Sequence, residues 1–399
     1  MLRASRSVGN KISMTYPLYS WTGCDSEGMM ENWEPPRENS VEALRHGMEF
    51  SDGVEFDLRM DAEGELVIYH DEFVTGKEPI GERCIERLST SELRSFGIVA
   101  FEDLLSDNEF TGSWQGGGKT VDIEIKIPHP MTKIETDRHL SSMMGKIESR
   151  LNDLELPEKS TLVSSFSPRI GPVSRSSEFG IPVTRLIPHI RAWGRYWRVK
   201  RTVAMPNFAR TSFQGMAKTL RNEGMESIGM ALEYLVGWTK WVNPTLPVGL
   251  TGNKLERFQR SRKGMGVIVW PAPLRFEDAL IGAGVTLVSD EMNPTLYSKP
   301  DGSARWPRPA SQPLDEEWRG RLLGAQSSEL PDVISEASSS LPMWSELTDE
   351  RRKGIVKEQA KRMLWPGDAD KWASKSNEGI PWGSPRILGH RGAGKTHSS

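Results

Sequence analysis

The residues best suited to chemistry lie in one stretch, 53–71, with the sequence GVEFDLRMDAEGELVIYHD. Apolar and charged residues alternate at its start, and side chains on a strand point alternately to its two faces. Glu55 and Asp57 therefore share one face of a predicted strand, an arrangement suited to a metal ion. The sequence then predicts a turn and a second short strand, which bring His70 and Asp71 near the two acids.

A further strand-like run, VDIEIKI at 121–127, carries another acid. Its alternation groups Asp122, Glu124 and Lys126 on one face. A third carboxylate on a strand is thus available to a site that forms where neighbouring strands end.

These runs belong to a longer series of strand-like and helix-like segments. Further strands are predicted at 161–166, 181–187, 227–235, 265–270 and 284–289, mostly with helical stretches between them. Repeated strand-then-helix units indicate a parallel sheet, and this many units over about 250 residues indicate a closed (β/α) barrel.

One of the predicted helices has a recognisable beginning. Asn39 is a plausible N-cap with Glu42 three residues later, as in a capping box. A longer helix is predicted over 131–154.

From about residue 293 the pattern changes, and residues 300–385 are rich in Pro, Ser and Trp, with helical candidates at 314–323 and 346–364. The final residues read as one more short strand that runs into a glycine-rich loop. We therefore expect four regions, which are a tail or loop at 1–35, a barrel at 36–292, a helical appendage or connector at 293–385 and a barrel strand at 386–399.

Composition excludes several classes of protein. The net charge is −3, from 51 Lys and Arg against 54 Asp and Glu, so the chain lacks the basic surplus of a dedicated nucleic-acid binder. Two cysteines, Cys24 and Cys84, are too few for a disulfide framework. No stretch is typical of a secretory signal or of a membrane span, which predicts a cytoplasmic protein.

An ordered set of motifs resembles the glycerophosphodiester phosphodiesterase family. The set comprises RENSVEAL at 37–44, Glu55-Phe-Asp57, His70-Asp71, Ile123-Glu-Ile-Lys126, Ser165-Phe166 and Val269-Trp270. The resemblance covers roughly residues 36–292 and implies a (β/α)8 TIM barrel with a divalent cation at the carboxyl-terminal mouth. It implies an enzyme of lipid metabolism that hydrolyses a glycerophosphodiester to glycerol 3-phosphate and an alcohol.

The resemblance also implies roles for individual residues. Glu55, Asp57 and Glu124 would bind the metal, and oxygen ligands of this kind suit Mg²⁺ or Ca²⁺ better than zinc. His70 would be one of two acid–base histidines, and Lys126 would contact phosphate. The alternative is that the three acids are neutralised by ion pairs with Arg59 or Lys126.

The chain departs from the family at one important place. The family begins with a strand that ends in His-Arg-Gly, whereas here this motif stands at His390-Arg391-Gly392, near the far end of the chain. Either the pattern is circularly permuted, with the first strand supplied by the C-terminus, or a second copy has just begun. We favour permutation, because the first and last strands of a closed barrel are neighbours.

Phosphodiester cleavage needs charge stabilisation on phosphate, a base for the attacking hydroxyl and an acid for the leaving alkoxide. His70 and His390 are the two predicted acid–base residues. Arg391, with Lys395, offers positive charge to the phosphate. Among the other histidines, His46, His129, His139 and His189 have no such context.

Residues 389–396 also satisfy the P-loop pattern for nucleotide binding. A P-loop depends on a following helix whose amides point at the phosphates, and only three residues remain after Thr396. The nucleotide-binding interpretation is therefore the weaker one.

Two further alternatives remain open. Residues 179–222 contain nine Lys and Arg and no acid, with aromatic residues interleaved, so 185–201 is either a solvated helix face or a surface that contacts phospholipid head groups. The displaced histidine motif leaves a catalytically inactive phosphate-binding or interaction barrel as the alternative to an enzyme.

Overall fold

Eight parallel strands form a closed barrel in the computed structural model, which describes residues 33–74, 83–187, 212–236 and 248–396. Strand β1 pairs with β4 on one side and with β10 on the other, and the pairing of β10 with β9 completes the ring. The barrel strands are β1 (Gly53–Met60), β4 (Thr120–Ile125), β5 (Thr161–Ser165), β6 (Val183–Ile187), β7 (Ser227–Ala231), β8 (Gly266–Trp270), β9 (Thr286–Ser289) and β10 (Ile387–His390). The predicted (β/α)8 TIM barrel is confirmed.

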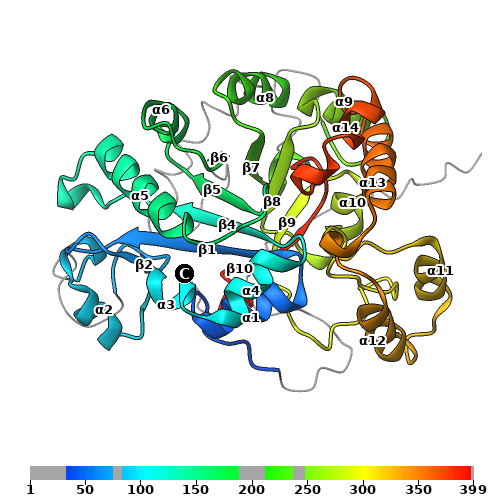
Figure 1. Ribbon diagram of the computed structural model, residues 1–399, viewed down its shortest axis with the longest axis horizontal. Coiled ribbons are helices and arrows are strands. Elements are labelled where there is room, and N and C mark those ends of the chain that lie inside the picture. Colours follow the sequence, from blue (N-terminus) through cyan, green and yellow to red (C-terminus); the bar gives the residue numbers. More distant parts are fainter. Residues whose placement is uncertain (1–32, 75–82, 188–211, 237–247, 397–399) are drawn as a thin grey trace, which may run out of the picture.

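Helices surround the strands (Figure 1). Those that flank the barrel are α1 (Val41–Phe50), α4 (Asn108–Gly116), α5 (Thr136–Leu151), α6 (Ile170–Ser176), α8 (Phe213–Asn222), α9 (Gly252–Arg262) and α10 (Glu277–Gly282). A small antiparallel extension continues from β1 through β2 (Leu66–Ile68) and β3 (Val99–Ala100), beside α2 (Thr90–Ser95) and α3 (Phe101–Leu105). The predicted hairpin around residues 61–64 is the first turn of this extension.

The alternation in β1 separates two environments. Val54, Phe56 and Leu58 are buried in the main apolar core with side chains of the surrounding helices. Glu55 and Asp57, on the opposite face, point into the barrel. Burying the apolar face against the helix layer thus fixes the register that holds both acids inside.

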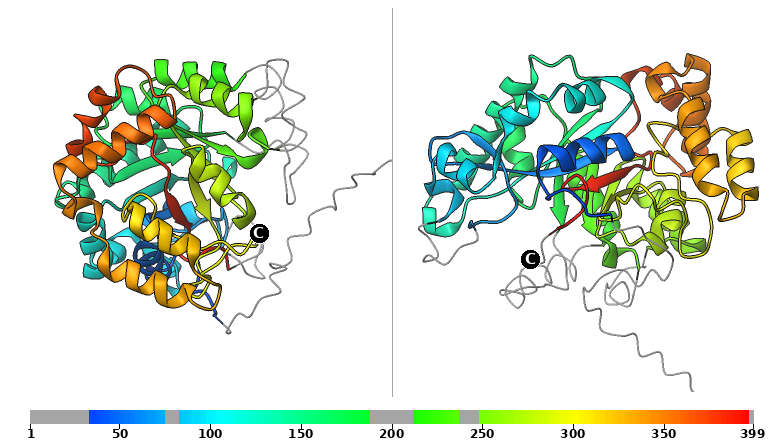
Figure 2. Two further views of the ribbon diagram at one scale, coloured as in Figure 1. Left: turned by 90° about the vertical axis from the view of Figure 1, so that its right-hand side faces the viewer. Right: turned by 90° about the horizontal axis from the view of Figure 1, so that it is seen from below.

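Strand β10 comes from the C-terminal part of the chain and fills the place between β9 and β1 (Figure 2). Gly389 and Gly392 allow its loop to pack against α1, since a Cβ on Gly392 would lie 2.4 Å from the carbonyl carbon of Ala43. Gly392 has a φ of 91°, which favours glycine. The amide of Thr396 donates to Glu38 at 2.8 Å, so the loop after β10 meets the segment before α1.

Residues between β9 and β10 form four helices, α11 (Glu316–Gly324), α12 (Leu330–Ser340), α13 (Asp349–Arg362) and α14 (Ala369–Ala373). They pack around tryptophans in two small apolar clusters outside the barrel. Asp52, at the start of β1, ties this connector to the barrel, because its carboxylate accepts the amides of Ser311 at 2.7 Å and Ile387 at 3.0 Å. The connector therefore helps to place β10.

Several local predictions need correction. The N-cap of α1 is Ser40, whose side chain accepts the amide of Ala43, and Asn39 instead has a φ of 60° and serves the site described below. Helix α5 begins at Thr136 rather than 131, because Pro128 and Pro130 hold the preceding residues in an extended segment and a 3₁₀ turn. Helix α12 was not anticipated.

Other expectations concern the two cysteines and the basic segment 185–201. Cys84 is a buried free thiol, while Cys24 and nearly all of 185–201, apart from residues 185–187, lie outside the described residues. Among the helices that the structure describes, none is both long and apolar enough to cross a bilayer.

Lys119, at the base of the barrel, should make stability depend on pH. Its side chain is 5% exposed and donates to the carbonyl of Ser51 at 2.5 Å, and burial lowers its pKa from 10.5 to about 7. The unfolded chain therefore binds the proton more strongly, and the free energy of unfolding should rise with pH between about 7 and 10 by up to about 1 kcal/mol per pH unit.

Replacing Lys119 by Met should flatten this pH dependence. Urea unfolding of both proteins at pH 7, 8 and 9 measures it. An equal slope in wild type and Lys119→Met would contradict the assignment.

Candidate active site at the carboxyl ends of the strands

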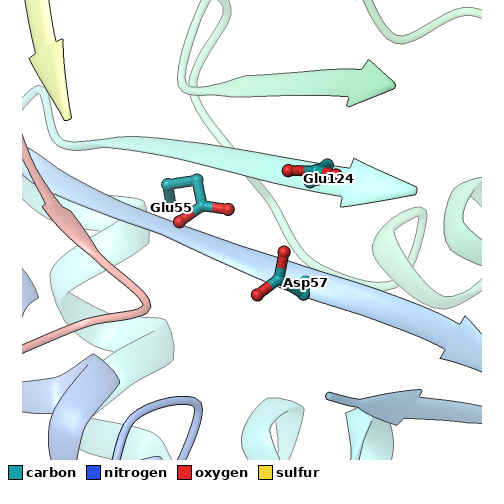
Figure 3. A group of neighbouring side chains, drawn as sticks. All are labelled: Glu55, Asp57 and Glu124. Carbon is teal, nitrogen blue, oxygen red and sulfur yellow. The ribbon is translucent and has the colours of Figure 1, made fainter. Parts of the chain in front are cut away.

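Three carboxylates meet inside the barrel, near the carboxyl ends of β1 and β4. Glu55 and Asp57 come from β1 and Glu124 from β4, where it stands in register with Asp57. Each offers an oxygen within 4.8 Å of the others, and all three are buried. Figure 3 shows the side chains pointing toward one another.

Burial and mutual repulsion disturb the titration of these acids. Burial, with the charges of Asp57 and Glu124, raises the pKa of Glu55 well above its usual value. Burial likewise raises the pKa of Glu124, against the attraction of Lys126. Burial would also raise the pKa of Asp57, but Lys126, His70 and Arg391 hold it well below its usual range. One acid thus stays ionised, and the other two retain protons more readily.

Two cations, the buried Arg391 and the largely buried Lys126, balance the cluster. Lys126 Nζ lies 2.7 Å from Asp57 Oδ1 and also pairs with Glu124. Arg391 Nε lies 3.3 Å from Asp57 Oδ2, and its Nη1 is 2.6 Å from Glu38. The ion pair with Lys126 that the alternative interpretation offered is therefore present. Arg59 instead pairs with Glu86 at 3.0 Å.

Strand β10 delivers His390 to this cluster. His390 stands in register with Glu55, and its Nε2 lies 3.8 Å from Glu55 Oε2. Its Nδ1 donates to Asp290 Oδ1 at 2.7 Å, since a carboxylate can only accept. This bond leaves Nε2 as the basic nitrogen. Burial lowers the pKa of His390, and Asp290 opposes this shift.

Asp290 was missed in the sequence. It directly follows β9 and accepts the amide of Lys395 at 3.1 Å as well as the ring of His390. Burial alone would raise its pKa, but His390 and Lys395 lower it to about 2. Its place at the carboxyl end of a barrel strand was the available signal.

His70 follows β2, which pairs with the carboxyl-terminal part of β1 along the same edge as β10. Its Nδ1 donates to Asp71 at 2.7 Å, and Arg59 donates to its backbone carbonyl at 3.0 Å. Burial and the charge of Lys126 lower its pKa to about 4, although 32% of the side chain is open to water. The ring is therefore neutral at pH 7, with Nε2 free to accept a proton.

Asn39 has a different role from the helix N-cap that the sequence predicted. Its side-chain amide donates to Asp57 Oδ2 at 2.9 Å, and its backbone amide donates to the carbonyl of Arg391 at 3.0 Å. It joins the acid cluster to the loop after β10. Its left-handed backbone conformation is common for asparagine.

The remaining inward-facing residues are charged on one half of the barrel interior and apolar on the other. Asp122, one layer below Glu124, has its pKa raised to about 7 by burial, with Glu124 and Asp57 adding to the shift. On the other half, a buried apolar group from β5, β8 and β9 packs with Trp382 and Trp270. Phe166, just after β5, contacts Trp270 edge to face at 5.5 Å. The interior thus has a charged half and an apolar half.

The histidines without predicted roles lie elsewhere. His46 bonds to the carbonyl of Met292, His129 caps a 3₁₀ turn and His139 contacts the carbonyl of Lys126. His189 lies outside the described residues.

The loop 389–396 has little capacity to bind nucleotide phosphates. Its amides at Arg391, Lys395 and Thr396 donate to the carboxylates of Glu55, Asp290 and Glu38. A P-loop needs such amides for phosphate. The structure thus disfavours the nucleotide-binding interpretation.

The acid cluster fits a hard divalent cation. Three carboxylate oxygens in mutual reach are the ligands that Mg²⁺ and Ca²⁺ prefer, and no cysteine or histidine stands within the triad to favour zinc. A cation there would replace the partial neutralisation that Lys126 now provides.

The fold is a (β/α)8 barrel, and its candidate active site lies at the carboxyl ends of the strands. The model of the glycerophosphoryl diester phosphodiesterase family matches residues 23–227, just over half of the chain. The chain belongs to this family and is therefore a phosphodiesterase.

Solved structures with this kind of fold include three named phosphodiesterases. A glycerophosphodiester phosphodiesterase from Thermotoga maritima is 17% identical, with 64% of this chain and 88% of that chain covered and a TM-score of 0.40. One from Parabacteroides distasonis is 16% identical, with 65% and 88% covered and a TM-score of 0.43. An Oleispira antarctica phosphodiesterase in complex with sn-glycerol-3-phosphate is 13% identical, with 63% and 86% covered and a TM-score of 0.41. No curated protein matches the sequence.

Asp290 should act as a positioning residue for His390. Asp290→Ala should lower kcat on a glycerophosphodiester by about 10²-fold or more, because it frees the ring and removes the charge that stabilises the imidazolium. Asp290→Asn, which keeps an acceptor for Nδ1, should retain more activity and shift the pH–rate profile.

Asp71→Ala provides the comparison, because the Asp71 side chain is 50% exposed and its charge is better screened by water. Its loss should lower kcat less. Equal kcat and identical pH profiles in wild type and Asp290→Ala would rule out the positioning role.

Proposed function

We propose that the chain hydrolyses glycerophosphodiesters to glycerol 3-phosphate and an alcohol, with a divalent cation and with His70 and His390 as acid–base residues. The observation that carries the proposal is the position of His390, 3.8 Å from Glu55, on a strand that arrives from the other end of the sequence. The displaced histidine was the reason to consider an inactive barrel. Because His390 reaches the acid cluster, hydrolysis is the better-supported function.

Glu55, Asp57 and Glu124 would hold Mg²⁺ or Ca²⁺, and a cation there would stabilise negative charge on the phosphate oxygens. Lys126 and Arg391 contribute to substrate binding. Their positive charges now face Asp57, and Lys126 also pairs with Glu124. With the carboxylates engaged by a cation, Lys126 would be available to a phosphate oxygen.

The two histidines divide the proton transfers. His70 is neutral at pH 7, since its pKa is lowered to about 4, so we assign it as the base that accepts a proton from water. Asp290, bonded to His390 Nδ1, stabilises the protonated ring, so we assign His390 as the acid that protonates the leaving alcohol. Arg59 orients His70 by donating to its backbone carbonyl, and Asp71 orients it by accepting a hydrogen bond from its Nδ1.

We also propose that the family pattern is circularly permuted in this chain. Support comes from β10, which carries the His-Arg-Gly motif and fills the position between β9 and β1 within the same chain. The loop after β10 meets residues 38 and 39 just before α1, at the place where an unpermuted chain would be continuous. The regions 36–292, 293–385 and 386–399 then form one barrel, its connector and its final strand.

Activity on glycerophosphocholine with added Mg²⁺ or Ca²⁺ tests the function. Glu55→Ala, His70→Ala and His390→Ala should each lower kcat by about 10²- to 10⁴-fold, because each removes a ligand or a proton-transfer group. Removal of divalent ions by a chelator should abolish activity, and adding the ion back should restore it.

His129→Asn is the matched control, because asparagine retains the N-cap and His129 is outside the acid cluster. It should keep near wild-type activity. Full activity in both Glu55→Ala and His70→Ala, or in the presence of chelator, would contradict the proposal.

A further inference from the structure

The mouth of the barrel carries an exposed apolar surface. Of the six large apolar side chains exposed in the described part of the chain, four lie here. Ile127, Met131 and Ile134 follow β4 and are 43%, 46% and 38% exposed, and Phe166 follows β5 and is 37% exposed. We name these four residues the apolar rim.

The backbone beneath the apolar rim is firmly held. Arg59 donates to the carbonyl of Ile127 at 3.4 Å, and Arg87 donates to the carbonyl of Met131 at 3.0 Å. Residues 130–132 form a 3₁₀ turn capped by His129. The side chains of Ile127 and Met131 thus stand on an ordered segment after β4.

The apolar rim is continuous with the site. Ile127 directly follows Lys126, which contacts two of the acids. Phe166 packs against Trp270, and Trp270 packs against the apolar half of the barrel interior. An apolar path therefore leads from Phe166, one of the four rim residues, to the interior wall that faces the charged half.

Because the apolar rim lies at the entrance to the site, a lipid surface fits it better than a protein partner does. A protein partner seated there would close the entrance to the acids and histidines and exclude substrate. A lipid surface in the same place would instead present substrate to the site. The ionic groups of the loop and of the first turn of α5 balance, with Lys133 and Arg138 against Glu135 and Asp137, so apolar insertion rather than net charge would dominate the contact.

We propose that the apolar rim inserts into a lipid surface and that the substrate is a lipid-borne glycerophosphodiester, one with an acyl chain that lies along the path through Phe166 and Trp270. This inference rests on the proposed function and specifies its substrate class. In the reaction, a water oxygen bonds to phosphorus, the bond from phosphorus to the head-group alcohol oxygen breaks, and one proton passes to that alcohol. The phosphate product is then glycerol 3-phosphate that still carries the acyl chain.

Flotation with phosphatidylcholine vesicles, with and without lysophosphatidylcholine, tests the rim. Wild type should float with the vesicles and hydrolyse the lysophosphatidylcholine in them when Mg²⁺ or Ca²⁺ is present. The triple variant Ile127→Ser/Met131→Ser/Ile134→Ser should lose at least about tenfold in vesicle affinity and in kcat/KM on vesicle substrate. Its kcat/KM on soluble glycerophosphocholine should stay within about twofold of wild type.

Leu323→Ser is the matched control, because Leu323 is 78% exposed on α11, outside the barrel. It should leave vesicle binding unchanged. If the triple variant does not fold, as judged by its thermal melt, Met131→Ser alone is compared with Leu323→Ser in the same flotation.

Vesicle binding equal in wild type and the rim variants would overturn the proposal, as would wild type that hydrolyses soluble diester but does not float. Self-association of wild type that the rim substitutions abolish would assign the rim to a second copy instead. Failure of wild type to hydrolyse any diester would reject the proposed function, while flotation would still decide the role of the rim.

Discussion

Repulsion among three buried carboxylates is the constraint on which the rest of this structure depends. Glu55, Asp57 and Glu124 are held within 4.8 Å of one another, where the effective dielectric is low and like charges disfavour joint ionisation. Lys126 and Arg391 relieve this repulsion only in part, since the pKa of Glu55 stays raised. Such a cluster is stable because the barrel supplies the fixed backbone positions and because a cation can complete its neutralisation.

The same constraint explains why the chain's C-terminal strand matters. Arg391 and His390 both reach the acids from β10, and the amide of Arg391 donates to Glu55 at 3.1 Å. The position of β10 depends in turn on the base of the barrel, where Asp52 binds both Ile387 and the connector. The Trp-rich connector therefore serves the site indirectly, by bringing the last strand back and fixing its register.

Much of this arrangement was predictable from the sequence, because the barrel interior is set by strand alternation. The alternation in 53–60 and 121–127 placed the acids on inward faces, and the order of motifs identified His70 and His390. Asp290 and Asn39 were missed or misplaced because their roles depend on partners from distant segments. Local capping rules also favour asparagine, and no local pattern distinguishes a helix cap from a left-handed residue that bonds to a carboxylate.

Binding of a divalent ion tests the account most directly. Calorimetric titration of the metal-free protein with Mg²⁺ or Ca²⁺ should show one site per chain in wild type, with a rise in Tm on binding. Glu55→Gln should melt no lower than wild type without metal, since one repulsive charge is removed and an acceptor for the Arg391 amide is kept. It should bind the ion at least about tenfold more weakly. Equal affinity and an equal Tm rise in the two proteins would contradict the claim that these acids form a metal site.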